Sequence, residues 1–127
     1  TDPGTAAFTK SFGQEYGFPP SQAAQTCYVQ TLLYADAVER AGTFYPPAVI
    51  KALEGFEFDG MGNGRTLYRA DDHQCFKDIL VVQGKENPKD KYDLLEIKEI
   101  VPREKTLYDA SIFGGDLGPD TAKATCA

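Results

Sequence analysis

The chain has no tryptophan, one histidine, one methionine and few basic residues. Lys and Arg number 13 against 19 Asp and Glu, which gives a formal net charge of −6. Nucleic acids and anionic membrane surfaces attract clustered positive charge, so this balance argues against both as partners. With one histidine and only three, widely spaced cysteines, a Cys/His metal site would need long-range assembly. We therefore expect no metal ion and no cofactor.

Long apolar stretches are also missing. The longest, residues 79–82, has the length of a strand, whereas a membrane-spanning helix needs roughly 20 apolar residues. Residues 1–4 lack the basic start and apolar core of a signal peptide, but a mature chain would lack one too. The 127 residues, 42% of them hydrophobic, suit one compact soluble domain.

The three cysteines leave two interpretations open. If the protein is exported, two of them can form a disulfide, and we favour Cys75 with Cys126 because both lie beside polar loop sequence. Cys27 lies among apolar residues of an expected helix, which is typical of a small core residue. The alternative is three free thiols in a cytosolic protein.

The first half of the sequence predicts helices and the second half predicts strands. We expect three helices, with starts at Thr5, Ser21 and Pro46. Each is followed by a glycine suited to a helix end, namely Gly17, Gly42 and Gly55. After residue 55 we expect a hairpin over residues 56–69, a strand over 78–83 and a return strand over 92–101. Residues 102–127 show little periodicity and predict an irregular tail.

Two segments resemble catalytic or phosphate-binding motifs. His73 with Asp72 could act as a general base, but adjacent residues on extended backbone point to opposite sides. We therefore favour a structural role, in which these side chains satisfy nearby backbone groups. Gly60, Gly62 and Gly64 could cradle a phosphate, but such a loop needs a helix directly after it. Here the sequence continues as a strand, so a tight turn is the better interpretation.

Several short segments follow one another in a characteristic order. They are Glu15-Tyr16-Gly17, Ala37-Val38-Glu39-Arg40-Ala41-Gly42, Ala52-Leu53-Glu54-Gly55, Phe56-Glu57-Phe58-Asp59-Gly60, Arg69-Ala70-Asp71-Asp72-His73-Gln74 and Val81-Val82-Gln83-Gly84. This order, over roughly residues 5–100, resembles the C-terminal region of type I periplasmic binding proteins, specifically the branched-chain amino acid type that serves ABC transporters.

The resemblance implies an α/β fold of two lobes joined by three crossing strands, of which this chain holds the C-terminal portion. Residues 1–77 would complete the first lobe, residues 78–101 would form a hinge-crossing strand and a return strand toward the second lobe, and 102–127 the tail. It implies a periplasmic or extracellular protein, not an enzyme, that captures an amino acid, amide or aromatic acid for an ABC importer. A ligand-sensing receptor domain of the same fold is one alternative, and a small hydrolase using His73 is a second.

The resemblance also implies where ligand contacts lie. In the family, the N-terminal end of the helix corresponding to residues 21–41 faces the cleft, which points to Gln22, Ala24, Gln25 and Thr26. Free N–H groups at a helix N-terminus also suit an anionic solute. Small and amide side chains replace the large apolar residue of some amino-acid binders, which counts against branched-chain specificity. For Gln25, an exposed helical position is the alternative.

The implied partners are the solute, the ABC permease subunits and the rest of the same binding protein. Without neighbouring strands, residues 78–83 and 92–101 would expose edges and apolar faces. We therefore expect self-association or swapping of elements.

Overall fold

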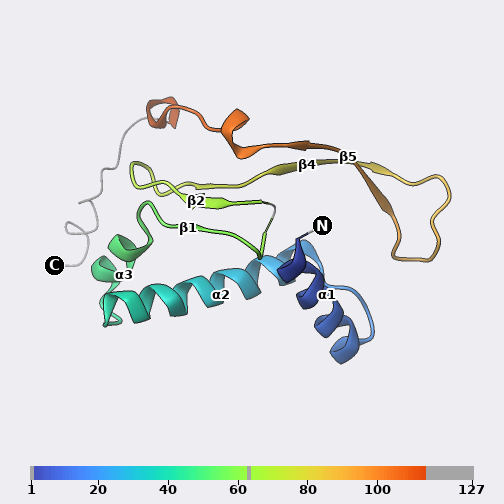
Figure 1. Cartoon of the computed structure of the whole chain (residues 1–127), viewed down its shortest axis with the longest axis horizontal. Helices are drawn as coiled ribbons and strands as arrows, with labels where there is room; N and C mark the ends of the chain where they lie inside the picture. The colour runs from blue at the N-terminus through green and yellow to red at the C-terminus, as the bar shows by residue number, and fades with distance from the viewer. Residues whose placement is uncertain (1, 63, 114–127) are drawn as a thin grey trace.

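The computed structural model describes residues 2–62 and 64–113 (Figure 1). Its helices are α1 (Pro3–Tyr16), α2 (Gln22–Ala41) and α3 (Pro46–Leu53). Its strands are β1 (Glu57–Phe58), β2 (Thr66–Tyr68), β3 (Cys75–Phe76), β4 (Ile79–Gly84) and β5 (Leu95–Val101). Two short 3-10 helices follow, η1 (Arg103–Lys105) and η2 (Ala110–Phe113). None of the helices in this described part is long and apolar enough to cross a membrane.

Local capping sets where the helices begin and end. The prediction that Thr5 caps the first helix is wrong, because the Asp2 carboxylate accepts the Thr5 N–H at 2.9 Å and α1 already begins at Pro3. For α2 the predicted cap is confirmed, since Ser21 Oγ accepts the Ala24 N–H at 3.2 Å. Gly17 and Gly42 end α1 and α2 in the left-handed conformation, where a side chain would be strained.

The helices pack around α2. Its C-terminal half contacts α3, and α1 meets it near its N-terminus (Figure 1). Ala37 of α2 and Val49 of α3 are buried in this contact. Arg40 lies with its guanidinium 4.0 Å from the Phe56 ring centroid and donates to the Ala52 carbonyl, so it joins α2 to the segment that follows α3.

The strands form two separate antiparallel sheets. One has the order β1-β2-β3, and its β1–β2 hairpin confirms the predicted pairing across the glycine-rich loop. The two-residue strand β3 was not predicted. The other sheet is the ribbon formed by β4 and β5, which pair from Ile79 opposite Val101 to Gly84 opposite Leu95, with an irregularity between Val81 and Val82.

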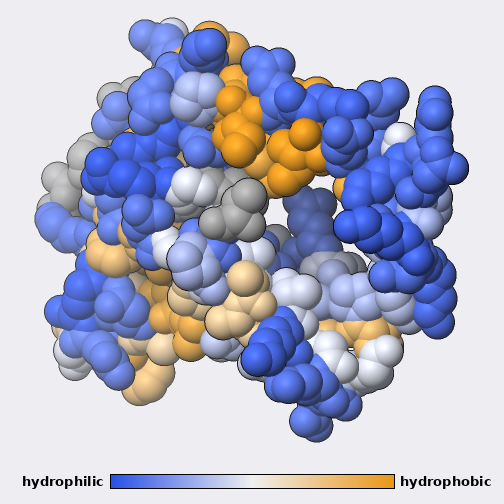
Figure 2. Space-filling model, turned by 45° about the vertical axis from the view of Figure 1, so that its right-hand side comes forward, coloured by the Kyte–Doolittle hydropathy of each residue, from blue (hydrophilic) through white to orange (hydrophobic). Residues whose placement is uncertain are grey.

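Much of the apolar surface remains exposed. We expected Cys27 to lie in a core, but Cys27 is exposed, and Ala37 is the one buried residue of α2. The prediction for Cys27 is wrong because the described elements pack against only part of α2. The ribbon is open as well, with Ile79, Val82 and Ile97 exposed. Figure 2 shows an apolar patch at the height of β4 and β5, bordered by hydrophilic residues.

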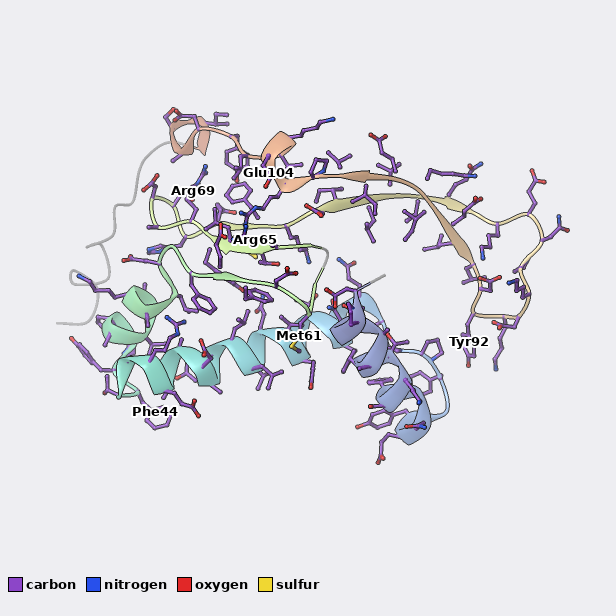
Figure 3. All side chains as sticks on the ribbon, in the orientation of Figure 1. Phe44, Met61, Arg65, Arg69, Tyr92 and Glu104 are labelled. Carbon is purple, nitrogen blue, oxygen red and sulfur yellow. The ribbon has the colours of Figure 1, made fainter. Side chains whose placement is uncertain are left out.

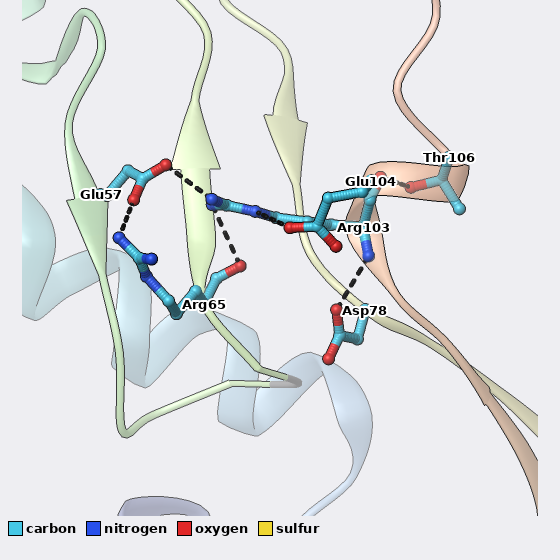
Figure 4. A network of polar contacts seen from close by, with 6 residues as sticks. All are labelled: Glu57, Arg65, Asp78, Arg103, Glu104 and Thr106. Carbon is cyan, nitrogen blue, oxygen red and sulfur yellow. Dashed lines mark hydrogen bonds and ion pairs between the residues drawn. The ribbon is translucent and has the colours of Figure 1, made fainter.

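Residues 102–113, here called the C-terminal strap, return from β5 to the three-stranded sheet. Arg103 Nη2 donates to Glu57 Oε1 at 2.7 Å, and the Arg103 N–H donates to Asp78 Oδ1 at 2.9 Å (Figure 4). Farther along, Arg69 donates to the Tyr108 carbonyl. The Tyr108 ring lies 5.3 Å from that of Phe76. The strap is therefore held at its start, by Arg103, and again near its middle, at Tyr108.

Candidate functional site

The first turns of α2 lie at the meeting point of three parts of the structure. The capped N-terminus of the helix faces α1 on one side and the three-stranded sheet on the other. Gln25 Nε2 donates to the Met61 carbonyl at 2.8 Å, which ties the β1–β2 loop to the helix. Met61 lies where this loop meets the start of α2 (Figure 3). It lines a hollow on each side, so the loop separates the two.

The hollow between α2 and the sheet, here called the sheet-side hollow, has a volume of about 40 Å³. Gln25 and Thr26 line it from the helix, and Thr66, Tyr68 and Lys77 line it from the strands and the segment after β3. None of the residues that line it is acidic, although the chain as a whole carries a net charge of −6. The hollow therefore favours hydrogen-bond acceptors and negative charge.

Two groups beside this hollow are kept protonated. Burial raises the pKa of Tyr68 to about 12, with a further increase from its interaction with Cys75. Burial also raises the pKa of the Cys75 thiol, against smaller lowering effects of the Tyr68 hydrogen bond and the Lys77 charge. At neutral pH the Tyr68 hydroxyl is therefore a hydrogen-bond donor as well as an acceptor.

The hollow between α1 and α2, here called the aromatic groove, is larger, with a volume of about 690 Å³. Phe8 stacks on Tyr28 with ring centroids 4.5 Å apart, and Phe12 lies 4.5 Å from Tyr16. Ala24 lines the groove from α2, and its small side chain leaves the space open. The groove can take a flat or apolar group, since aromatic faces pack well against both.

The structure brings three of the four predicted contact residues to these hollows. Gln25 and Thr26 line the sheet-side hollow and Ala24 lines the aromatic groove. Gln22 is exposed and lines neither. Sequence reasoning missed Thr66 and Lys77, because which strand residues face a helix is decided by packing. The one signal in the sequence was that residues 66–68 form a short strand, in which successive side chains point to opposite faces.

The acidic and histidine segment after β2 has a structural role. Arg69 holds Asp72 through two hydrogen bonds, of which Nε to Oδ1 is 2.8 Å long. His73 has a positive φ of 57° and its Nε2 lies 3.0 Å from Glu54 Oε1, so it does not pair with Asp72. The geometry thus agrees with the structural interpretation of this segment and lacks the Asp72–His73 pair on which the hydrolase hypothesis depends.

Metal-ligating side chains and cysteines are the other groups that could form a site. Within residues 2–62 and 64–113, no three His, Cys, Asp or Glu side chains gather closely enough to hold a metal ion. Cys75 is a free thiol beside Tyr68, and Cys126 lies outside the described residues, as does most of the predicted tail. The Cys75–Cys126 pairing therefore stays a prediction.

The three helices and the two small sheets are consistent with part of a two-lobed α/β fold. The family model described as periplasmic binding protein matches residues 1–91, so the chain belongs to this family. The family consists of solute-binding proteins rather than enzymes, and its name places its members in the periplasm. Among curated proteins, none is similar enough in sequence to match the chain.

Solved structures of three bacterial proteins are similar to this chain. A branched-chain amino acid ABC transporter periplasmic ligand-binding protein from Burkholderia xenovorans LB400 superposes with a TM-score of 0.77 at 24% identity, over 88% of this chain and 30% of that one. An amino acid ABC transporter substrate-binding protein from Pseudomonas fluorescens Pf-5 superposes with a TM-score of 0.71 at 25% identity. The match covers 87% of this chain and 28% of that one. A periplasmic binding protein from Burkholderia mallei superposes with a TM-score of 0.72 at 20% identity, and the match covers 86% of this chain and 29% of that one. The chain spans less than a third of the length of these structures.

Proposed function

We propose that the chain is part of the solute-binding component of an ABC importer that works in the periplasm or outside the cell. It would capture a small organic solute, such as an amino acid, an amide or an aromatic acid, between two lobes. The family match supports the class of protein. The names of two similar structures, an amino acid and a branched-chain amino acid transporter binding protein, support the importer context.

One observation about this chain carries the proposal. Three of the four residues expected to contact the solute line hollows that flank the first turns of α2. One hollow has no acidic side chain among its lining residues and presents Gln25, Thr66 and Lys77, and the other is lined by aromatic rings. Together they suit a solute with an acceptor or anionic group and an apolar part, because each part meets a matching surface.

The division of the chain follows the same proposal. Residues 1–77 would belong to one lobe, residues 78–101 would carry the chain across the hinge and toward the other, and 102–127 would be the tail. The base of the ribbon supports this, since Asp78 before β4 and Arg103 after β5 are hydrogen-bonded to each other. Solute binding would shift an equilibrium between open and closed lobes, which the permease senses.

The test is solute binding by the full-length protein, measured by calorimetry with amino acids, their amides and aromatic acids. We expect one class to bind, and Gln25→Ala to weaken that binding by roughly tenfold through loss of a polar contact and of the Met61 tie. Gln14→Ala, an exposed amide on α1, is the matched control and should leave affinity unchanged. Absence of binding to every compound, or equal affinity in both variants, would contradict the proposal. Solute-dependent uptake with the permease would separate transport from sensing.

A further inference from the structure

The sheet-side hollow contains a polar group that has no partner in the structure. Thr66 is only 2% exposed, and its Oγ1 is buried without a hydrogen-bond partner among the described residues. A buried hydroxyl without a partner costs free energy, so a group that accepts or donates a hydrogen bond is expected beside it. The backbone at Gly62 leaves this space open, because a Cβ there would lie 3.3 Å from the hydroxyl oxygen.

A second observation fixes the charge of the missing group. Lys77 lines the same hollow and has no hydrogen bond or ion pair with any of the described residues. The other lining residues carry no acid that could neutralise it. A partly buried ammonium and an unpartnered hydroxyl in one hollow both favour an anionic acceptor.

The size of the hollow limits the ligand. About 40 Å³ exceeds what one water molecule needs, and it accommodates a group of roughly the size of a formate ion or a halide. A hollow of this volume encloses a small planar or spherical anion more closely than a large tetrahedral or polyhydroxylated one. The ligand is therefore a small monovalent anion or the carboxylate end of a larger molecule.

We propose that Thr66 and Lys77 form a binding site for a small anionic group in the sheet-side hollow. The Thr66 hydroxyl would donate one hydrogen bond and the Lys77 ammonium would supply a charge-assisted one. Tyr68 also lines the hollow, but its hydroxyl already interacts with Cys75. The site does not depend on the proposed transport function, since anion binding would occur whether or not a permease recognises the protein.

The test uses the full chain and sodium formate at constant ionic strength, with sodium methanesulfonate, a larger anion without a carboxylate, as the balancing salt. We expect a saturable rise in the thermal midpoint with formate, as for any ligand of the folded state. Thr66→Val and Lys77→Gln should each weaken the apparent formate affinity by roughly tenfold or more. Lys77→Arg should retain it, and Lys10→Gln, an exposed lysine on α1, should not change it.

The outcomes separate the possible occupants. A midpoint that does not change saturably with formate, or that changes equally in all variants, would mean that the hollow holds only water and would overturn the proposal. If a variant fails to fold, as judged by circular dichroism, size selectivity in the unmodified chain decides: formate must bind more tightly than sulfate. A second experiment adds benzoate, a larger carboxylate, together with formate. Competition with formate would identify the carboxylate of a larger solute as the ligand, whereas formate binding without competition would identify a free small anion.

Discussion

Gly4 and Gly13 lie in the same helix but have different surroundings. A Cβ on Gly4 would overlap the carbonyl of Gly60, so this glycine allows α1 to approach the β1–β2 loop. A Cβ on Gly13 would lie 3.9 Å from its nearest neighbour, the carbonyl oxygen of Phe18, which is an ordinary van der Waals contact. The two positions therefore differ in how they respond to the same added methyl group.

We predict that Gly4→Ala destabilises the chain by about 1–3 kcal/mol, because the loop must move to make room. Gly13→Ala should stabilise it by up to about 1 kcal/mol, since alanine loses less conformational entropy than glycine in a helix. Urea unfolding monitored by circular dichroism measures both. Equal changes in the two variants would show that α1 does not contact the Gly60 carbonyl.

The Arg69–Asp72 pair gives a second prediction, for acid conditions. The hydrogen bonds from Arg69 hold the pKa of Asp72 below its ordinary value of 3.8. Because the folded state lowers this pKa, the contribution of Asp72 to stability is present above about pH 4 and is lost as the pH falls further.

We therefore expect Asp72→Asn to destabilise the chain at pH 7, and the difference from the unmodified chain to narrow below about pH 4. The measurement is urea unfolding at pH 7 and pH 3. Asp71→Asn is the matched control, because Asp71 is the exposed neighbour of Asp72 and carries the same charge. A difference that stays constant with pH would contradict the prediction.

At the scale of the elements, the strap connects the ribbon to the three-stranded sheet. Arg103 makes most of this connection. Its guanidinium donates to Glu57 and to the Arg65 carbonyl, and its backbone N–H donates to Asp78 (Figure 4). Its side chain is 11% exposed, whereas that of Arg65, which also pairs with Glu57, is 64% exposed. Two arginines thus share one carboxylate in different solvent environments.

We predict that Arg103→Met costs about 1–3 kcal/mol of unfolding free energy, since it leaves partly buried acceptors without a donor. Arg65→Met should cost less than about 1 kcal/mol, as for an exposed ion pair. Proteolysis of the strap, followed by mass spectrometry, should also become faster only in the Arg103 variant. Comparable losses in the two variants would mean that Arg103 does not anchor the strap.

At the scale of the whole molecule, the exposed ribbon is the main unpaired surface. Val82 and Ile97 face each other across β4 and β5, and both are exposed although both are apolar. Exposed strand edges with apolar faces favour pairing with another chain. We propose that the chain associates with itself through β4 and β5 when the remainder of its binding protein is absent.

Sedimentation velocity over a range of micromolar concentrations tests this. The unmodified chain should show concentration-dependent dimers or larger species. Ile97→Lys should shift it toward the monomer, because a charge on the apolar face must be desolvated in the interface. Asn87→Lys, in the exposed loop between the strands, is the control for added charge and should have little effect. A monomeric unmodified chain at every concentration would contradict the proposal.

The sequence alone determined the elements that depend on local chemistry. Ser21 and Gly42 bound α2 as predicted, and the glycine-rich loop joins two strands, because capping and turn formation depend on neighbouring residues. The order of these elements was also enough to identify the family. Packing decided the rest. Only the tertiary structure brings Thr66 and Lys77 beside the start of α2, and only it leaves Cys27 exposed, because both depend on contacts between segments far apart in the chain.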